Sequence, residues 1–335
     1  MSTILIVGGY GAVGRLAAGD LASRAHRVVV AGRRLDAATA AAAELGVEGR
    51  RIDLDEPTTW QEACEDVDLV LMCMDQRETA FVEFLLGRAI HYVDIAANDD
   101  FFLSLEALPA PRRSGVLLSV GLAPGLTNVM AASCAAGLRG PLDVGIGLLF
   151  GLNDDHGRAG VEWTASKLFA ADRKPGSTIF DFGRDWGTRR LHRLDFSDQH
   201  ALMRTLPQAR AATYLGFDSR LATSLVFALA GRFAGSRLAR DFAVAAFRPI
   251  GLGTRACDIS VSVTGGLEGR RVTRAMRFHA SGESATTARL AALMTSIFLE
   301  DPVPGIWHSH QVLDPATVLA EAERRGIGTL ETVAL

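Results

Sequence analysis

Lysine, cysteine and long apolar runs are all scarce in this sequence of 335 residues. Its lysines are Lys167 and Lys174, so a mechanism that depends on lysine has two candidates. Its four cysteines, at positions 64, 73, 134 and 257, form no Cys-x-x-Cys pair and show no metal-ligand spacing. We therefore expect a reducing, cytoplasmic setting and no metal site.

The longest apolar run covers residues 221–231 and ends at Arg232. It is well short of the roughly 20 residues that a membrane span needs, and no secretory hydrophobic segment precedes the first predicted strand. The formal net charge of -3 gives no sign of the basic surface that nucleic acid binding requires. We expect no integral membrane contact and no nucleic acid partner.

The first third of the chain alternates short β-rich runs with alanine-rich amphipathic stretches. This alternation is typical of βαβ units that build a parallel sheet. We predict an α/β fold in which residues 1–123 form a doubly wound, Rossmann-type domain. Its strands are expected at residues 4–7, 28–31, 51–53, 69–74, 92–95 and 116–120.

The pattern changes beyond residue 123. Residues 124–300 predict an α+β substrate and dimerisation domain, with strands at 143–150, 178–182 and 189–194 and a hairpin formed by 259–264 and 272–279. Residues 200–250 are apolar and rich in arginine, and they predict a helical insertion with a solvated arginine face. A lid for an anionic substrate and a membrane-surface patch are the alternatives for this segment. Residues 301–335 form a separate C-terminal segment.

A GxGxxG motif at residues 9–14 directly follows the first predicted strand and opens a helix. Gly9 permits the tight turn, Gly11 lets the backbone approach a pyrophosphate, and Gly14 allows the helix to pack closely on the strand. Ala12 and Val13 occupy the helix N-terminus that faces the anion. The motif predicts a bound dinucleotide.

The end of the second strand indicates which dinucleotide binds. An acidic residue about 20 residues past the glycines would select NAD, whereas this strand leads into Arg33 and Arg34. Two guanidinium groups suit a 2′-phosphate, so NADP(H) is favoured. A merely solubilising pair of arginines is the alternative, and nearby Asp36 keeps NAD(H) open as the less favoured cofactor.

Two further strand ends complete the predicted cofactor site. We expect Asp53 and Leu54, after the third strand, to flank the adenine. Cys73 and Met74, after the fourth, are expected along the ribose and nicotinamide. Cys73 is interpreted as a small buried hydrophobic residue rather than a redox group.

The chemistry must come from a second site, because Rossmann domains host many reactions. Short-chain dehydrogenases and sugar epimerases use a Tyr-x-x-x-Lys pair, and none of Tyr10, Tyr92 and Tyr214 has a lysine four residues on. The sequence also lacks a nucleophile elbow, an HExxH motif and a P-loop.

Three segments carry a family resemblance. They are HYVDIA at residues 91–96, VGLAPGLTN at 120–128, and a stretch from PGIW at 304–307 to RRGI at 324–327. Together they resemble the saccharopine dehydrogenase family, in the broad sense that includes saccharopine reductase and carboxynorspermidine dehydrogenase. Residues 140–260 align with no one member.

The resemblance implies an NAD(P)-dependent oxidoreductase that acts on a C–N bond of an amino-acid-derived small molecule. The reaction would be hydride transfer to an imine, or the reverse oxidation of a secondary amine. The resemblance also implies a C-terminal segment that returns to the nucleotide domain, and we expect a homodimer formed through the second domain's sheet. Enoyl reduction of a bulky or lipid-like substrate is one alternative function. A non-catalytic NADP-binding sensor or scaffold is the other.

Three candidates for catalysis or substrate contact lie in or near the first domain. Asp94 ends the fifth strand at the crevice edge, where it would orient the nicotinamide or the amine, or else cap the following turn. Asn98 is a candidate for substrate binding, with helix capping as the alternative. Asn128, in the Pro-Gly-x-x-Asn segment, is a candidate for substrate or cofactor contact.

The second domain supplies three more candidates. His156 has a near-neutral reference pKa and is a candidate acid or base, with a solvated loop residue as the alternative. Lys167 is a candidate general acid or base, with an exposed helix lysine as the alternative. Glu162, close to Lys167 in sequence, is a candidate for substrate binding.

Overall fold

The computed structural model describes residues 2–154, 158–172, 174–246 and 253–334. The chain folds as two compact units, the first of residues 1–129 and 287–322, the second of residues 130–286 and 323–335. The sequence pattern puts the borders at residues 123 and 300, where turns occur. In the structure all three borders fall inside helices, namely α6 (Thr127–Ala135), α11 (Glu283–Glu300) and α13 (Pro315–Arg324).

The first unit contains a seven-stranded parallel sheet in the order β13-β6-β5-β4-β1-β2-β3. Every residue of β1, β4 and β6 is buried, because helices cover both faces of a parallel sheet and strand sequences are then apolar throughout. The strands are β1 (Thr3–Val7), β2 (Arg27–Gly32), β3 (Glu48–Arg51), β4 (Leu69–Met72), β5 (His91–Asp94), β6 (Gly115–Leu118) and β13 (Gly305–His308). The predicted Rossmann-type fold is confirmed.

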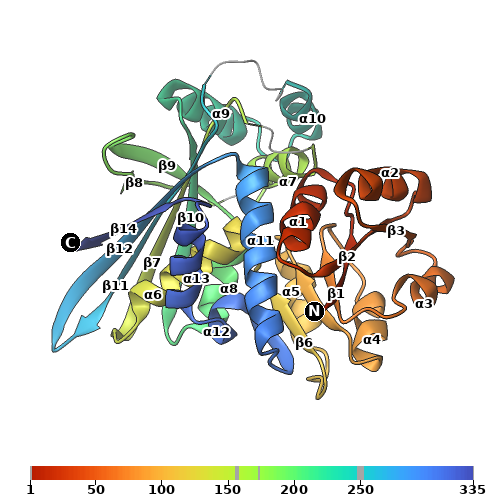
Figure 1. Ribbon diagram of the computed structural model, residues 1–335. Coiled ribbons are helices and arrows are strands. Elements are labelled where there is room, and N and C mark those ends of the chain that lie inside the picture. The colour runs from red at the N-terminus through yellow and green to blue at the C-terminus, as the bar shows by residue number, and fades with distance from the viewer. Residues whose placement is uncertain (1, 155–157, 173, 247–252, 335) are drawn as a thin grey trace. The chain divides into compact units, whose positions relative to one another are not determined.

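The helices of the first unit lie on either side of this sheet. In Figure 1, α1 and α2 lie on one side of β1–β3 and α4 on the other. Leu5, Val29 and Tyr92 belong to the core that Trp60 and Phe81 fill from α3 and α4. The elements are α1 (Ala12–Ser23), α2 (Leu35–Leu45), the 3-10 turn η1 (Pro57–Thr59), α3 (Trp60–Ala63), α4 (Ala80–Gly87), α5 (Asp99–Glu106), the irregular segment η2 (Leu122–Leu126) and α12 (Ser309–Val312).

The third strand lies earlier than predicted. The sequence analysis predicts a strand at residues 51–53, but β3 ends at Arg51. As an edge strand β3 needs only its backbone pairing with β2, so polar residues suffice. Asp53 and Leu54 consequently follow the strand by two and three residues.

The C-terminal segment returns to the first sheet, as the resemblance implies. Strand β13 runs parallel to β6, and the last residue of β13, His308, is buried. Its Nδ1 is 2.8 Å from the Ser119 hydroxyl and its Nε2 is 2.9 Å from a Glu106 carboxylate oxygen. Ser309 donates to the Ser119 carbonyl at 2.6 Å. These hydrogen bonds fix β13 on the sheet.

We predict that His308→Phe lowers the free energy of unfolding by about 2–4 kcal/mol, because this buried side chain loses one buried and one partly buried hydrogen bond. Phenylalanine keeps the edge contact with the Phe102 ring, whose centroid is 5.6 Å away. Urea unfolding measures the loss. The control is Trp307→Phe, which removes one exposed hydrogen bond from the same strand. An equal loss in both variants would contradict the role assigned to His308.

The second unit contains a seven-stranded mixed sheet in the order β14-β12-β11-β7-β10-β9-β8, in which β10 and β7 run parallel. The last strand, β14, pairs with β12, so the C-terminal segment contributes a strand to each unit. The predicted hairpin is present, with Glu268 (φ 49°) and Gly269 (φ 78°) at its tip. The strands are β7 (Arg139–Phe150), β8 (Ser177–Asp181), β9 (Thr188–Leu194), β10 (Ala209–Phe217), β11 (Ala256–Leu267), β12 (Arg270–Ser281) and β14 (Thr329–Ala334).

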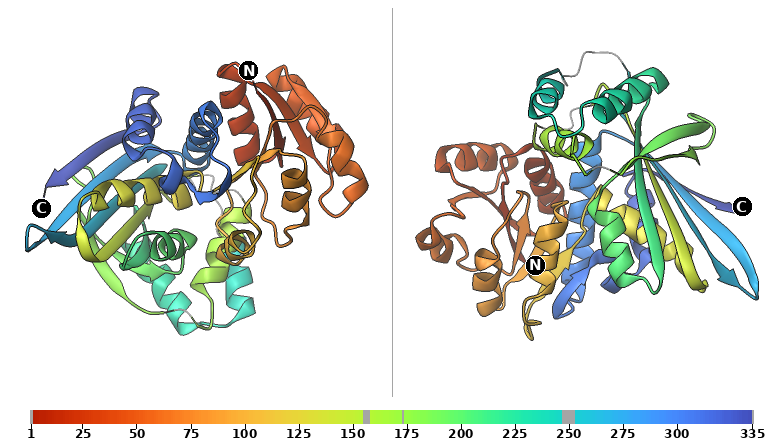
Figure 2. Two further views of the ribbon diagram at one scale, coloured as in Figure 1. Left: turned by 90° about the horizontal axis from the view of Figure 1, so that it is seen from below. Right: turned by 180° about the vertical axis from the view of Figure 1, so that it is seen from behind.

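The predicted helical insertion over residues 200–250 needs correction, because β10 lies inside it. Alanine and arginine favour helices, yet alternate residues of β10 are buried between β7 and β9, and tertiary pairing overrides local preference. The helices of this unit are α7 (Arg158–Leu168), α8 (Ser197–Thr205), α9 (Arg220–Arg232) and α10 (Arg237–Ala246). Figure 2 shows α9 and α10 at the same end of the unit, beyond the sheet.

Candidate functional site

The loop between β1 and α1 is held against its neighbours by backbone contacts. Gly8 has a φ of 80°, and its amide and that of Gly9 donate to the Ala31 carbonyl at 2.9 and 3.2 Å. A Cβ on Gly14 would lie 2.4 Å from the Gly8 carbonyl oxygen. Glycine at position 14 therefore lets α1 begin directly against the loop.

The N-terminus of α1 faces outward without a side-chain partner of its own. Gly11 is the N-cap, no side chain caps it, and the first turn holds no acidic residue. A Cβ on Gly11 would meet only the Gly8 carbonyl oxygen, at 3.1 Å. The first-turn amides, including those of Ala12 and Val13, and the positive end of the helix dipole are therefore arranged to receive an anion.

Two exposed arginines follow β2. Arg33 and Arg34 form no ion pair in the described part of the chain. The Arg34 guanidinium carbon lies 5.7 Å from the centre of the Tyr10 ring, which in turn covers Gly32. Asp36 lies in the first turn of α2, where its charge complements the helix dipole. This arrangement leaves two cationic groups at the strand end predicted to meet a 2′-phosphate.

The loop after β3 is held by hydrogen bonds to Asp53. A carboxylate oxygen of Asp53 accepts from the Asp55 amide at 3.2 Å, and the backbone carbonyl of Asp53 accepts from the Trp60 indole at 2.9 Å. Leu54 is half-buried and packs on the core beneath the sheet. These contacts hold the loop in place where the adenine is predicted.

The residues after β4 contact the glycine loop. A Cβ on Gly8 would lie 2.6 Å from the Met74 Cγ and 3.1 Å from the Cys73 carbonyl oxygen. Met74 is exposed, whereas burial, with the nearby Asp94 carboxylate, raises the pKa of the Cys73 thiol. A thiol with a raised pKa stays protonated at neutral pH, which agrees with a packing role rather than a redox role.

Asp94 ends β5 as a fully buried carboxylate with both oxygens engaged. One accepts from the Tyr92 hydroxyl at 2.5 Å and the other from the Ala96 amide at 2.6 Å. Burial raises the pKa of Asp94 to about 7, although both hydrogen bonds oppose the shift. The hydrogen bond from the Ala96 amide caps the turn after β5. Capping is the alternative to a role in orienting the nicotinamide or the amine.

Sequence reasoning missed Tyr92, the direct hydrogen-bond partner of Asp94, and Gln76, which joins Asp94 through Tyr92. The Gln76 amide donates to the Tyr92 hydroxyl at 2.5 Å, which links the loops after β4 and β5 through a buried network. Burial and the Asp94 carboxylate raise the pKa of Tyr92 well above its usual range. The two-residue spacing of Tyr92 and Asp94 places them on one face of the strand and is the signal that predicts their contact. No comparable signal marks Gln76.

The two asparagine candidates make local hydrogen bonds. The Asn98 oxygen accepts from the Phe101 amide at 3.3 Å and caps α5, while its nitrogen donates to Asp75 and to the Gln76 carbonyl, each at 3.3 Å. Asn128 is fully buried, and its oxygen accepts from the Gly125 amide at 3.0 Å. Both residues hold loops at the carboxyl edge of the sheet.

The remaining candidates lie in the second unit or outside the described residues. The Lys167 nitrogen is 3.3 Å from an Asp195 carboxylate oxygen, and it lies 5.6 Å from the centre of the Trp163 ring. Glu162 is exposed on α7. His156 lies outside the described residues. Within those residues, no cluster of His, Cys, Asp and Glu side chains fits a metal ion, and no helix is both long and apolar enough to cross a membrane.

The order of the parallel sheet and the glycine loop at its carboxyl edge define a dinucleotide-binding domain. Residues 4–118 match the family described as "Saccharopine dehydrogenase NADP binding domain". This match confirms the resemblance to the saccharopine dehydrogenase family and the assignment of NADP(H) to the first unit. A search of curated proteins finds no match.

Solved structures share the fold of the whole chain. Apo saccharopine dehydrogenase (L-Glu forming) from Saccharomyces cerevisiae is 15% identical, with a TM-score of 0.62 over 100% of both chains. DAP dehydrogenase from C. glutamicum, in complex with DAP, is also 15% identical, with a TM-score of 0.50 over 97% of this chain and 99% of its own. The similarity covers both units of the chain.

We predict that Gly11→Ala and Gly14→Ala have different effects. Gly11→Ala places a methyl group where the anion would approach, so it should weaken NADPH binding at least tenfold with little loss of stability. Gly14→Ala forces α1 away from Gly8 and should lower the free energy of unfolding by about 1–3 kcal/mol. Fluorescence titration and urea unfolding measure the two quantities. Equal destabilisation by both variants would contradict the separate roles.

We predict that Asp94 makes stability fall as pH rises between about 4 and 7. Its native-state pKa of about 7 exceeds the value near 3.9 of an unfolded chain, so between these values the native state binds more protons. The free energy of unfolding should fall by up to about 1.4 kcal/mol per pH unit from this group, and Asp94→Asn should remove that slope. Urea unfolding from pH 4.5 to 7.5 measures it. Identical slopes in both proteins would contradict the prediction.

Proposed function

We propose that this protein is an NADP-dependent oxidoreductase that transfers hydride to an imine, or from a secondary amine, of an amino-acid-derived substrate. The observation that carries the proposal is the anion-receiving N-terminus of α1 beside two exposed arginines, within a domain of the NADP-binding family. The two similar solved structures support the substrate class, because they are dehydrogenases of saccharopine and of DAP.

The residues present fit NADP(H). The amides at the start of α1 would hold the pyrophosphate, because the N-cap glycine leaves them open and no acidic side chain competes. Arg33 and Arg34 would bind the 2′-phosphate with charge-assisted hydrogen bonds. Asp53 and Leu54 would border the adenine, and Cys73 and Met74 the ribose and nicotinamide.

Bound NADPH supplies the hydride, and the chain supplies orientation and charge. Met74 is exposed at the edge where the loops after β1 and β4 meet, so its flexible side chain would pack on the nicotinamide ring. Asp94 would act as a positioning residue, because both of its oxygens already hold Tyr92 and the turn at Ala96.

The second unit carries further candidates for proton transfer and substrate contact. His156 and Lys167 remain the proposed acid–base residues, and Glu162 the proposed contact for a substrate amine. Asn98 and Asn128 would act by holding the loops at the carboxyl edge in place, which also fixes any backbone groups that meet the substrate. We propose that the enzyme works as a homodimer.

We predict that the double variant Arg33→Ala/Arg34→Ala binds NADPH about 10- to 100-fold more weakly and binds NADH almost as the wild type does. The reason is that charge-assisted hydrogen bonds to the 2′-phosphate contribute about 1.5–3 kcal/mol. Fluorescence titration with both nucleotides measures the ratio. The control is Arg27→Ala, an exposed arginine at the opposite end of the same strand. Equal loss for NADPH and NADH would contradict 2′-phosphate recognition.

The reaction class is tested by NADPH oxidation at 340 nm in mixtures of amino acids with keto acids or aldehydes. Turnover that requires both an amine and a carbonyl compound supports imine reduction. Turnover with an unsaturated acyl substrate alone would instead indicate enoyl reduction. Tight NADPH binding without any turnover would favour a sensor or scaffold and overturn the proposed enzyme.

A further inference from the structure

A stripe of large apolar side chains lies exposed on α9, α10 and their connection. Leu221 is 84% exposed, Leu238 is 85% exposed and Phe242 is 75% exposed. We call this the α9–α10 patch, and its members are Leu221, Leu225, Leu229, Phe233, Leu238 and Phe242. Clusters of this kind on a protein surface mark interaction sites, whereas single exposed leucines are ordinary.

The patch is not the face by which α9 packs on its own unit. That face consists of Thr223, Phe227 and Ala230, which are buried. The Phe227 ring stacks on His192 of β9, with centroids 4.4 Å apart. Spacings of four and three residues put these side chains on one stripe of the helix, so the leucines at 221 and 225 belong to a different stripe. The fold of the unit therefore does not need them.

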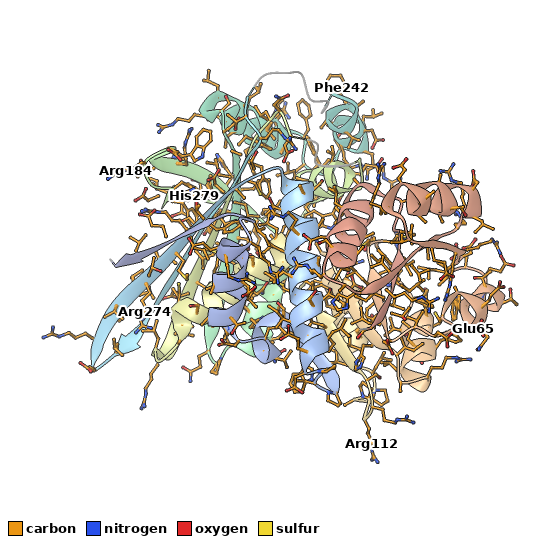
Figure 3. The ribbon with its side chains drawn as sticks, viewed as in Figure 1. Glu65, Arg112, Arg184, Phe242, Arg274 and His279 are labelled. Atoms are coloured by element: carbon orange, nitrogen blue, oxygen red, sulfur yellow. The ribbon has the colours of Figure 1, made fainter. Side chains whose placement is uncertain are left out.

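The second helix extends the patch. Leu238 and Phe242 are one turn apart on α10 and share a face. Figure 3 labels Phe242 on α10, at the top of the view. Helix α10 packs on α7, and Ala239, Ala243 and Val244 are less exposed than Leu238 and Phe242. The two helices thus present two amphipathic faces at one end of the unit.

The charge around the patch is positive in a protein whose net charge is -3. From Arg220 to Ala246 the chain has four arginines and one aspartate. Asp241 pairs with Arg240 at 2.7 Å, which leaves Arg220, Arg232 and Arg237 as exposed cations. An apolar stripe bordered by arginine is typical of helices that lie in the interface of an anionic membrane.

We propose that the α9–α10 patch docks this protein on an anionic lipid surface, with the leucines and phenylalanines among the acyl chains and the arginines at the headgroups. A second copy of the chain fits the patch less well. Two-fold dimers place a surface against itself, so the three exposed arginines would face three more. The proposal is independent of the cofactor and of the reaction.

Vesicle flotation of the full-length protein tests this proposal. We expect at least tenfold more protein to float with vesicles of 70% phosphatidylcholine and 30% phosphatidylglycerol than with phosphatidylcholine alone, and 0.5 M NaCl should reduce the difference. Leu238→Glu/Phe242→Glu should lower the bound fraction at least tenfold. Arg232→Gln/Arg237→Gln should remove the preference for anionic lipid.

The control is Ile179→Glu, which places the same charge on an exposed apolar residue of β8, outside the patch. It should float like the wild type, and all variants should keep their circular dichroism spectrum and NADPH affinity. Absence of flotation by the wild type, or equal flotation of the patch variant and the control, would overturn the proposal. A dimer that Leu238→Glu/Phe242→Glu converts to monomer, without vesicle binding, would assign the patch to a second copy instead.

Discussion

The first unit depends on a close backbone approach that only glycine permits. Because a Cβ at Gly14 would lie 2.4 Å from the Gly8 carbonyl oxygen, α1 can start directly after β1 only without a side chain there. That start points the first-turn amides outward at the carboxyl edge of the parallel sheet. Strands β2, β4 and β5 end at the same edge, so Arg33 and Arg34, Met74 and the buried Asp94 all lie along it.

Much of this edge is predictable from sequence because its signals are local. The GxGxxG motif needs only a strand before it and a helix after it, and buried parallel strands are apolar along their whole length. Arg33 and Arg34 are recognisable by their position after the second strand. The return of the C-terminal segment was implied by family resemblance alone, because a four-residue strand such as β13 carries too little pattern to be assigned.

The parts that escaped prediction depend on contacts between distant residues. Strand β10 has a composition that favours helix and becomes a strand only between β7 and β9. The Gln76–Tyr92–Asp94 network joins two loops, and nothing in the sequence near Gln76 marks it. The fold buries Asn128 and uses its oxygen to accept from the Gly125 amide, a contact that sequence spacing does not reveal, and its contact with substrate or cofactor stays a prediction. Local sequence pattern identifies candidate polar residues, whereas tertiary packing decides which of them are buried and which face solvent.

Binding of NADP(H) at the carboxyl edge of the first sheet is tested most directly by hydrogen–deuterium exchange with and without NADPH. On binding, the amides at the start of α1 would donate hydrogen bonds to the cofactor and exchange more slowly. We predict slower exchange in peptides that cover residues 8–14, 32–36 and 73–76, and unchanged exchange in α9 and α10. Protection confined to other peptides, or no protection at saturating NADPH, would contradict NADP(H) binding at this edge.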